Sequence, residues 1–405
     1  MEKKGILVFG AGALGLGFLG PELHNGYSLT FADREPKGEF IAHLGKKGEY
    51  RINLTTPAIE VVPVRGVEGL NLDDNREREK VVKKIGQVSL IFTAVGLSNL
   101  KEVASIVAKG IEKHPERKEE LYILCCENGR DVPAKFKGFL QKNVVNLPSW
   151  VKISEPIAGR MCRYEDKVKP WGDFEPVGTD FSWGIVAEPF YGIPVRRSLV
   201  AESTVVSPAF QVKEDGEFEA LKERKMLIHN GCHTFLALLG YLKGHTYYYQ
   251  LEEQILRLAE KMVNKEMIEA LLSRFKGTLD RNDLKNYSFE VLRRIISPLF
   301  GDSISRGTRG SLDKLAPQER LIWGAKFIWS AGFVPQIYSM GIAAAIKINQ
   351  GQGRVAGSLE EILSQHCGLK QPRDAKLIDL IKSGYSEIAG RFGESKGDRS
   401  SSLHR

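Results

Sequence analysis

A glycine-rich turn near the start of the chain sets the strongest limit on its fold. The apolar run 5–9 leads directly into Gly10-Ala-Gly-Ala-Leu-Gly15, which matches the pattern G-x-G-x-x-G. The next segment, 14–23, has the composition of a helix, and 27–31 reads as a second strand that ends at Asp33. This order of strand, glycine turn, helix, strand and acidic residue is typical of a dinucleotide-binding βαβ unit.

Each position of the turn has a physical task in holding a pyrophosphate. Gly10 permits the tight turn, Gly12 lets the backbone approach the phosphates, and Gly15 lets the helix pack closely on the strand. The start of the helix faces the phosphate charge, so Ala13 and Leu14 are also predicted cofactor-binding residues.

The residues after the second strand bear on the choice between NAD and NADP. The Asp33 carboxylate can accept hydrogen bonds from a ribose hydroxyl and would repel a 2′-phosphate. The adjacent Arg34 weakens this distinction, because an arginine can accommodate the 2′-phosphate. We predict NAD as the cofactor, and both residues belong to the predicted cofactor site.

Strands and helices continue to alternate after this unit. A buried strand, 88–95, ends at Val95 and Gly96, and a helix follows. A further strand, 121–126, ends at Asn128, which is either a turn residue or a polar group aimed at the reacting carbon. Because ligands bind at the carboxyl ends of parallel strands, Val95 and Gly96 are predicted to contact the cofactor. The fold class predicted here is α/β, with an N-terminal Rossmann-type doubly wound parallel sheet.

The length of the chain favours two domains, because 405 residues exceed one ordinary hydrophobic core. We predict a dinucleotide-binding domain over 1–205 and a mostly α-helical substrate domain over 206–390, where apolar residues recur at helical spacing. The polar segment 391–405 is predicted to be a disordered tail.

Composition excludes several classes of partner. The formal charge of +8 is spread along the chain, and no nucleic-acid-binding motif is present. The five cysteines show no zinc-binding spacing, so no metal is predicted, and their odd number suits a reducing compartment. No apolar run is long enough to span a bilayer. We expect a cytoplasmic protein, a monomer or weak homodimer, whose partner is a small molecule.

The stretch 225–233 combines polar side chains with the pattern of a buried helix. At about 100° per residue, Asn230 and His233 lie roughly 140° and 80° around the helix from Lys225, so all three can face one cleft. Burial would lower the pKa of the lysine toward that of a general base, and the amide could donate to an oxyanion. The alternative is a snorkelling lysine, a satisfied histidine and a capping asparagine.

A second group of cations lies in the Gly/Ser-rich loop 297–315. Arg306, Arg309 and Lys314 follow one another closely there, in a setting that leaves backbone N–H groups free. Such a loop can hold an anionic or polyhydroxylated ligand. The alternative is an ordinary solvated loop.

Taken together, these segments resemble the long-chain polyol dehydrogenases, also called the mannitol dehydrogenase family. The most specific part of the resemblance is the spacing Lys-x4-Asn-x2-His that begins at Lys225 and occurs in the same chain as the glycine turn. Other similar segments are 9–20, 30–33, 93–96, 126–128 and the spacing from Arg306 to Lys314. The similarity extends from about residue 5 to about residue 350.

The resemblance implies hydride transfer without a metal. It assigns Lys225 as the general base, His233 as the residue that orients the substrate, and Asn230 with Asn128 as donors to the alkoxide-like oxygen. It also implies that Arg306 and Lys314 hold substrate oxygens. Because a guanidinium suits phosphate, Arg309 favours a sugar phosphate, and the expected reaction interconverts mannitol 1-phosphate and fructose 6-phosphate with NAD.

One segment departs from the family pattern. Where the family usually has Val-Asp-Arg-Ile, this chain has Ala158-Gly-Arg160-Met161, so Gly159 occupies the position of the aspartate. The departure keeps open a free-polyol dehydrogenase or a reductase of hexuronates such as fructuronate and tagaturonate. A non-catalytic dinucleotide sensor is a further alternative, although it gives Lys225 no task.

Overall fold

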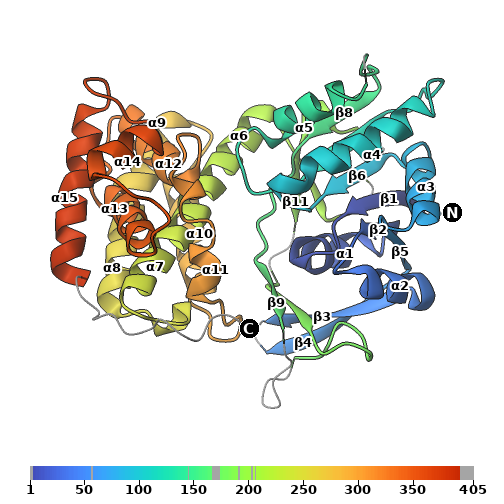
Figure 1. Ribbon diagram of the computed structural model, residues 1–405, viewed down its shortest axis with the longest axis horizontal. Coiled ribbons are helices and arrows are strands. Elements are labelled where there is room, and N and C mark those ends of the chain that lie inside the picture. Colours follow the sequence, from blue (N-terminus) through green and yellow to red (C-terminus); the bar gives the residue numbers. More distant parts are fainter. Residues whose placement is uncertain are drawn as a thin grey trace. The chain divides into compact units, whose positions relative to one another are not determined.

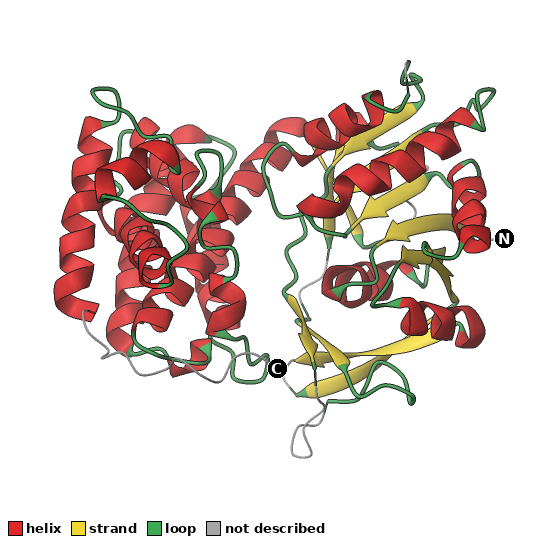
Figure 2. Ribbon diagram, in the orientation of Figure 1, coloured by secondary structure: helices red, strands yellow, loops and turns green. Residues whose placement is uncertain are grey.

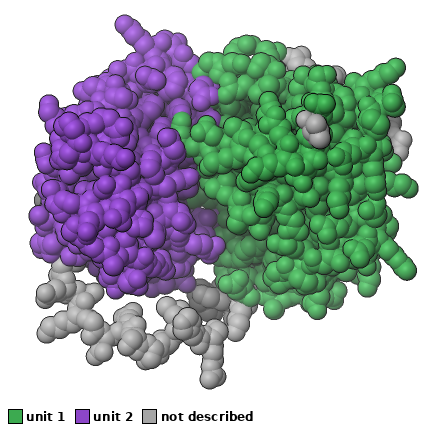
Figure 3. Space-filling view, turned by 45° about the horizontal axis from the view of Figure 1, so that its top comes forward, with its two compact units in different colours: residues 1–218 green, residues 219–405 purple. Residues whose placement is uncertain are grey.

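The computed structural model of the protein (Figure 1) describes residues 3–55, 58–144, 146–166, 174–189, 192–201, 204–205 and 207–392. The last described strand ends at Lys213, and helices dominate from there on (Figure 2). The chain divides into two compact units, Met1–Phe218 and Glu219–Arg405, here called unit 1 and unit 2 (Figure 3). The predicted tail lies outside the described residues, except for 391 and 392.

A six-stranded parallel sheet forms the centre of unit 1. Its strands lie in the order β5-β2-β1-β6-β7-β8, and every neighbouring pair is parallel. This is the strand order of a doubly wound dinucleotide-binding fold, so the predicted fold class is confirmed. The strands are β1 (Lys4–Phe9), β2 (Tyr27–Asp33), β5 (Val67–Asn71), β6 (Leu90–Thr93), β7 (Leu121–Cys125) and β8 (Val151–Ser154).

Both faces of this sheet are buried, which explains its almost continuous apolar strands. Along β1, Ile6 and Val8 belong to one core, and Leu7 and Phe9 belong to the other. The core around Leu7 and Phe9 includes side chains of α3 (Asn75–Ile85), α4 (Leu100–Glu112) and α5 (Val132–Gln141). The opposite core includes the π-helical turn Gly15–Leu19, α1 (Gly20–Leu23) and α2 (Gly38–Lys47).

A second sheet packs on that opposite core and was not foreseen as a unit. Its strand order is β4-β3-β10-β9, with β3 and β10 parallel and the outer pairs antiparallel. Tyr50, Ile52 and Ile185 from this sheet join Leu16 and Phe18 in the core. The strands are β3 (Glu49–Thr55), β4 (Ile59–Arg65), β9 (Cys162–Glu165) and β10 (Gly184–Ala187), and a separate parallel pair is β11 (Ile193–Arg196) with β12 (Phe210–Lys213).

The described residues of unit 2 are mostly helical, as predicted. The helices from the unit boundary onward are α6 (Asp215–Arg224), α7 (Gly231–Leu242), α8 (Glu253–Met262), α9 (Ile268–Arg274), α10 (Arg281–Ile295), α11 (Ile304–Thr308), α12 (Arg320–Ser330), α13 (Gln336–Gly351), α14 (Leu359–Gln365) and α15 (Ala375–Phe392). Two π-helical turns, Lys225–Asn230 and Val263–Met267, join α6 to α7 and α8 to α9. Short 3-10 turns are Leu97–Asn99, Arg197–Leu199, Tyr248–Gln250 and Asp313–Leu315.

The core of unit 2 forms around α7 and α13, which are apolar on nearly all sides. They pack against each other, and α13 also contacts α12 and α15. The amino end of α13 is buried, and the Glu266 carboxylate accepts hydrogen bonds from the backbone N–H groups of Ile337 and Tyr338 there. Among the described helices, none has the length and apolar character needed to cross a membrane.

Candidate cofactor and catalytic sites

The glycines of the turn differ in whether the fold itself requires them, because the space for a side chain differs between the three positions. Gly10 has a φ of 108°, and a Cβ there would lie 2.5 Å from the Ala94 carbonyl oxygen. A Cβ on Gly15 would lie 2.1 Å from the Gly10 carbonyl oxygen, so close packing excludes a side chain. At Gly12 the nearest atom would be 3.5 Å away. The fold therefore tolerates a side chain at Gly12, which fits a position reserved for the approach of a pyrophosphate.

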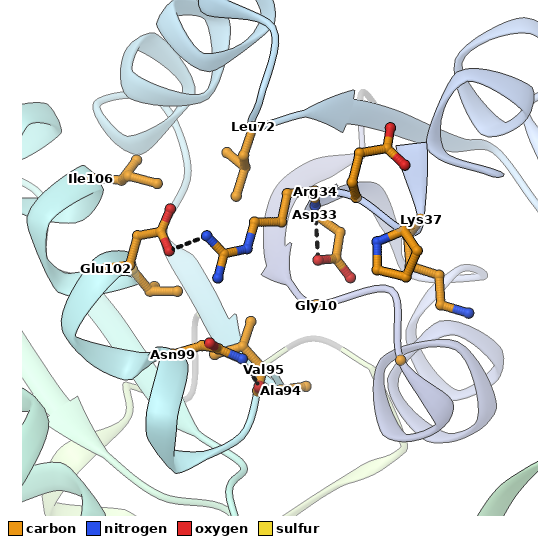
Figure 4. Close-up of a pocket in the computed structure, with 14 residues that line it drawn as sticks. Gly10, Asp33, Arg34, Lys37, Leu72, Ala94, Val95, Asn99, Glu102 and Ile106 are labelled. Atoms are coloured by element: carbon orange, nitrogen blue, oxygen red, sulfur yellow. Dashed lines mark hydrogen bonds and ion pairs between the residues drawn. The ribbon is translucent and has the colours of Figure 1, made fainter. Parts of the chain in front are cut away.

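A cavity of about 330 Å³ opens beside this turn, at the carboxyl ends of β1, β2 and β6 (Figure 4). Its lining residues are Gly10, Gly12, Asp33, Arg34, Glu35, Pro36, Lys37, Leu72, Ala94, Val95, Asn99, Glu102, Val103 and Ile106. Gly10, Gly12, Asp33, Arg34 and Val95 are predicted cofactor residues that meet here. Ala13, Leu14, Gly15 and Gly96 are not part of this lining and stay predictions.

Asp33 and Arg34 are held in different ways at the edge of the cavity. The Asp33 carboxylate accepts hydrogen bonds from the backbone N–H groups of Ala11 (2.7 Å) and Arg34 (2.9 Å). The Arg34 guanidinium extends toward α4 and pairs with Glu102 at 2.6 Å (Figure 4). This ion pair, which the sequence did not suggest, engages the guanidinium that the sequence offered as a partner for a 2′-phosphate.

A partly buried carboxylate organises the ends of β6 and β7. Glu127 accepts hydrogen bonds from the Thr93 hydroxyl (2.7 Å) and from the Val95 backbone N–H (3.1 Å). Burial raises the pKa of Glu127, and these hydrogen bonds oppose the rise. Asn128 follows directly and is exposed. Glu127 therefore fixes the loop that carries the predicted cofactor residues Val95 and Gly96.

Arg160, next to the position where the family pattern is broken, anchors the glycine-turn helix. It is 6% exposed, and its guanidinium donates to the Gly17 carbonyl oxygen at 3.0 Å and pairs with Glu22 on α1. Its carboxylate partner therefore lies on α1.

In unit 2, the segment that begins at Lys225 is a π-helical turn rather than a regular α-helix. The wider turn changes the angle between successive residues, so the positions derived from 100° per residue were wrong for this segment. Lys225 is partly buried, and Asn230 is 7% exposed. The Asn230 amide nitrogen lies 3.4 Å from the Met226 sulfur, which is a weak acceptor. Turns of this kind often occur at functional sites.

His233 lies in a buried polar network. Its Nε2 is 2.8 Å from the Asp302 carboxylate, and its Nδ1 is 3.2 Å from the Tyr248 hydroxyl. Burial lowers the pKa of His233, although Asp302 acts in the opposite direction. Burial would raise the pKa of Asp302, but hydrogen bonds from His233 and Arg306 hold it well below its usual range. A substrate hydroxyl would have to replace Tyr248 as the partner of Nδ1.

The predicted anion-binding loop brings several cations together. The Lys314 ammonium donates to the Gly307 carbonyl oxygen at 2.6 Å. Burial, followed by the charges of Arg320, Arg306 and Arg309, lowers the pKa of Lys314 to about 7. Arg309 is exposed, and the buried Nε of Arg320 has no hydrogen-bond partner among the described residues. The loop therefore carries more positive charge than Asp302 and Asp313 can balance, which favours an anionic ligand.

Two family models match most of the chain. The model of the mannitol dehydrogenase Rossmann domain matches residues 4–201, and the model of the mannitol dehydrogenase C-terminal domain matches residues 217–380. The chain belongs to the mannitol dehydrogenase family. The family resemblance that the sequence suggested is confirmed, and so is its class, a dehydrogenase with a dinucleotide-binding domain.

Curated relatives match over nearly their whole length. The mannitol-1-phosphate 5-dehydrogenase of Caldanaerobacter subterraneus subsp. tengcongensis is 26% identical over 95% of this chain and 99% of its own. The enzyme of that name from Geobacillus stearothermophilus is 28% identical over 88% of this chain and 91% of its own.

Solved structures of similar fold include two sugar-alcohol dehydrogenases. The match to a substrate-free D-sorbitol dehydrogenase has a TM-score of 0.69 at 13% identity, covering 97% of this chain and 94% of the other. The match to Pseudomonas fluorescens mannitol 2-dehydrogenase, solved with NAD and D-mannitol, has a TM-score of 0.66 at 12% identity, covering 97% and 93%. These matches support the fold of this mannitol dehydrogenase family member.

Several residues near the sites were missed by the sequence reasoning. His229 lies inside the Lys225–Asn230 turn, is 6% exposed, and its Nδ1 has no partner among the described residues. Asp302 and Tyr248 support His233, and only the i, i+4 spacing of Asp302 and Arg306 signalled a pair. Around the described residues there is no cluster of three His, Cys, Asp or Glu side chains that could hold a metal.

Proposed function

We propose that this protein is an NAD-dependent oxidoreductase that interconverts mannitol 1-phosphate and fructose 6-phosphate. The phosphate assignment rests on the group of cations around Lys314. This group includes Arg320, whose Nε has no hydrogen-bond partner among the described residues. Curated relatives named mannitol-1-phosphate 5-dehydrogenase support the same substrate. The open position at Gly12, the cavity and the Arg34–Glu102 pair support NAD.

NAD, when bound in unit 1, would supply the hydride acceptor for oxidation of the alcohol carbon. Lys225 would take the hydroxyl proton during oxidation and return it during reduction. Asn230 and Asn128 would donate hydrogen bonds to the oxygen as negative charge develops on it. The weak sulfur acceptor beside the Asn230 amide leaves its N–H groups available for this task.

His233 and the cations would position the substrate. The Asp302 carboxylate restrains both the His233 ring and the Arg306 guanidinium, so these two groups can present a fixed surface to substrate hydroxyls. Lys314 and Arg309 would hold the phosphate, whose negative charge would balance the excess positive charge of the loop.

The test is a panel of carbonyl substrates with purified protein. NADH oxidation is followed with fructose 6-phosphate, fructose, fructuronate and tagaturonate, and the panel is repeated with NADPH. We expect the highest kcat/KM with fructose 6-phosphate and NADH. Activity confined to unphosphorylated ketoses would refute the phosphate assignment, and absence of turnover across the panel would favour a dinucleotide sensor.

A hexuronate reductase is the second candidate, because a carboxylate could also balance the charge around Lys314. Arg309→Ala separates the two candidates, since the Arg309 side chain is exposed and the proposed task is phosphate contact. If the substrate is a phosphate, the variant raises the KM for it about tenfold. If the substrate is a hexuronate or a free polyol, kcat/KM stays nearly unchanged.

The proposal also places the protein in the reducing environment of the cytoplasm. All five cysteines of the chain are free thiols in buried positions. The predicted monomer or weak homodimer stays a prediction, which sedimentation of the purified protein tests.

A further inference from the structure

Lys37, a residue with no assigned task, occupies an unusual position in the cofactor cavity. It directly precedes α2, and its side chain lines the same cavity as Gly12 and Asp33. Its ammonium lies 4.2 Å from the centroid of the Tyr164 ring and 4.1 Å from that of the Trp183 ring. Two aromatic faces that close attract a cation and restrict the side chain to few rotamers.

The two rings come from the second sheet, which gives that sheet a role at the cavity. Tyr164 belongs to β9, and Trp183 directly precedes β10. Trp183 also packs edge-to-face on the Tyr164 ring at 5.7 Å, so the rings support each other. The cation is therefore held by elements that are rigidly paired in the β9–β10 ladder.

The Tyr164 side chain, which contacts the ammonium through its ring, reaches the glycine turn with its hydroxyl. The Tyr164 hydroxyl lies 3.4 Å from the Ala11 carbonyl oxygen and 3.5 Å from where a Cβ on Gly12 would lie. In Figure 4, Arg34 extends toward Glu102, whereas Lys37 extends in the opposite direction. The two cations of this cavity thus serve different parts of it.

Within the described part of the chain, no carboxylate forms an ion pair with the Lys37 ammonium. Among the described residues no oxygen accepts a hydrogen bond from it, and the nearby carboxylates are those of Asp33 and Asp166. Burial lowers the pKa of Lys37, and these two carboxylates raise it. Asp33 is already engaged by two backbone N–H groups. A ligand anion beside Gly12 would give the ammonium a direct partner.

We propose that Lys37 binds the pyrophosphate of the dinucleotide, and that Tyr164 and Trp183 form an aromatic clamp that holds it in place. This proposal rests on the proposed use of a dinucleotide cofactor. A clamped cation loses little conformational freedom when the ligand binds, so its contact is more effective than that of a flexible surface lysine.

The test measures binding directly, by calorimetric titration of the full-length protein with ADP, adenosine, 2′-AMP, NADH and NADPH. Lys37→Met removes the charge and keeps the length of the side chain, Lys37→Arg keeps the charge, and Lys46→Met is the matched control on an exposed position of α2. We expect Lys37→Met to weaken the affinity for ADP about tenfold and to leave the affinity for adenosine unchanged. Lys37→Arg should retain most of the affinity, and Lys46→Met all of it.

A double-mutant cycle tests the clamp. Trp183→Leu should weaken ADP binding when Lys37 is present. In the Lys37→Met background it should have little further effect, because the ring acts through the lysine. Tyr164→Phe keeps the aromatic face and should change little. Far-UV circular dichroism and thermal melting of each variant separate a binding loss from a folding loss.

Three outcomes would overturn the proposal. Equal ADP affinity of Lys37→Met and the natural chain would show that Lys37 does not contact the pyrophosphate. A loss confined to 2′-AMP and NADPH would place the contact at a 2′-phosphate instead. If neither ADP nor NADH binds the natural chain, the cofactor assignment fails and the Lys37 proposal fails with it.

Discussion

Asp302 holds His233 and Arg306 in one buried arrangement, accepting a hydrogen bond from the His233 Nε2 at 2.8 Å and from the Arg306 Nε at 2.6 Å. The Asp302 side chain is completely buried, and the other two are partly exposed. A single carboxylate therefore fixes the tautomer of the histidine, with the proton on Nε2, and the direction of the guanidinium.

Asp302→Asn is expected to lower both stability and activity. An amide has only one acceptor oxygen and carries no charge, so the partly exposed Arg306 loses its carboxylate partner inside the network. We expect a loss of about 3 kcal/mol in the free energy of unfolding and a fall of roughly 100-fold in kcat/KM. Urea unfolding and steady-state kinetics measure these effects, with Asp379→Asn on an exposed position of α15 as control. Unchanged kinetics would show that the network has no part in catalysis.

Lys225→Met should abolish proton transfer and preserve cofactor binding. The substitution keeps most of the side-chain volume at the start of the π-helical turn and removes the group proposed to move the proton. We expect kcat to fall by about 10²- to 10⁴-fold, and the affinity for NADH to stay within about twofold. Stopped-flow kinetics and fluorescence titration provide the two readings, and Lys265→Met on an exposed site is the control. Turnover close to that of the natural chain would exclude Lys225 as the general base.

The N-terminal half of the fold could be predicted because its signals are local. The turn from Gly10 to Gly15 lies between an apolar strand and a helix. The predicted strands 88–95 and 121–126 were short apolar runs, and β6 (Leu90–Thr93) and β7 (Leu121–Cys125) confirm them. The second sheet was missed because β3 pairs with β10, which lies more than a hundred residues later. Strands of mixed polarity that pair over such separations leave no periodic signal strong enough to connect them.

The candidate site in unit 2 could be predicted only in part. The spacing of Lys225, Asn230 and His233 identified the segment, but calculated helix angles could not reveal a π-helical turn. The task of Asp302 also stayed hidden, because the contact to His233 joins residues 69 apart in sequence. Which carboxylate contacts a buried histidine depends on tertiary packing, and packing between residues so far apart in sequence cannot be read from a local pattern.

The glycine turn allows one matched pair of variants. Gly15→Ala places a Cβ 2.1 Å from the Gly10 carbonyl oxygen, so the helix must move away from β1. We expect a loss of about 1–3 kcal/mol in the free energy of unfolding. The fold has space for a Cβ at Gly12, so Gly12→Ala should keep the melting temperature. It should weaken NADH binding about tenfold or more, because the methyl group would block the approach of the pyrophosphate. Equal loss of stability in both variants would contradict this division of tasks.

Glu102→Gln should improve the use of NADPH. Glu102 pairs with Arg34 at 2.6 Å at the edge of the cavity, and its charge opposes a 2′-phosphate. Without that charge the guanidinium can turn toward the phosphate, and we expect the NADPH affinity to rise about three- to tenfold. NADH affinity should change by less than about twofold. Glu112→Gln, near the other end of α4, is the control. If both coenzymes respond equally, the pair does not discriminate between them.

His229→Leu should change how stability depends on pH. Burial, followed by the charges of Arg294 and Lys225, lowers the pKa of His229 well below its usual 6.5. Below that pH the unfolded chain binds a proton that the folded chain does not, so acid favours unfolding and stability falls as the pH drops through 6.5.

The natural chain should therefore lose roughly 1 kcal/mol between pH 8 and pH 5.5 through this residue alone. Leucine removes the titration and also the buried Nδ1 without a partner, so the difference in unfolding free energy between variant and natural chain should grow by that amount as the pH falls. Urea unfolding across this pH range measures the difference, and His366→Leu on an exposed position is the control. A difference that stays constant with pH would mean that His229 binds a proton as readily in the folded protein as in the unfolded chain, which its cationic surroundings oppose.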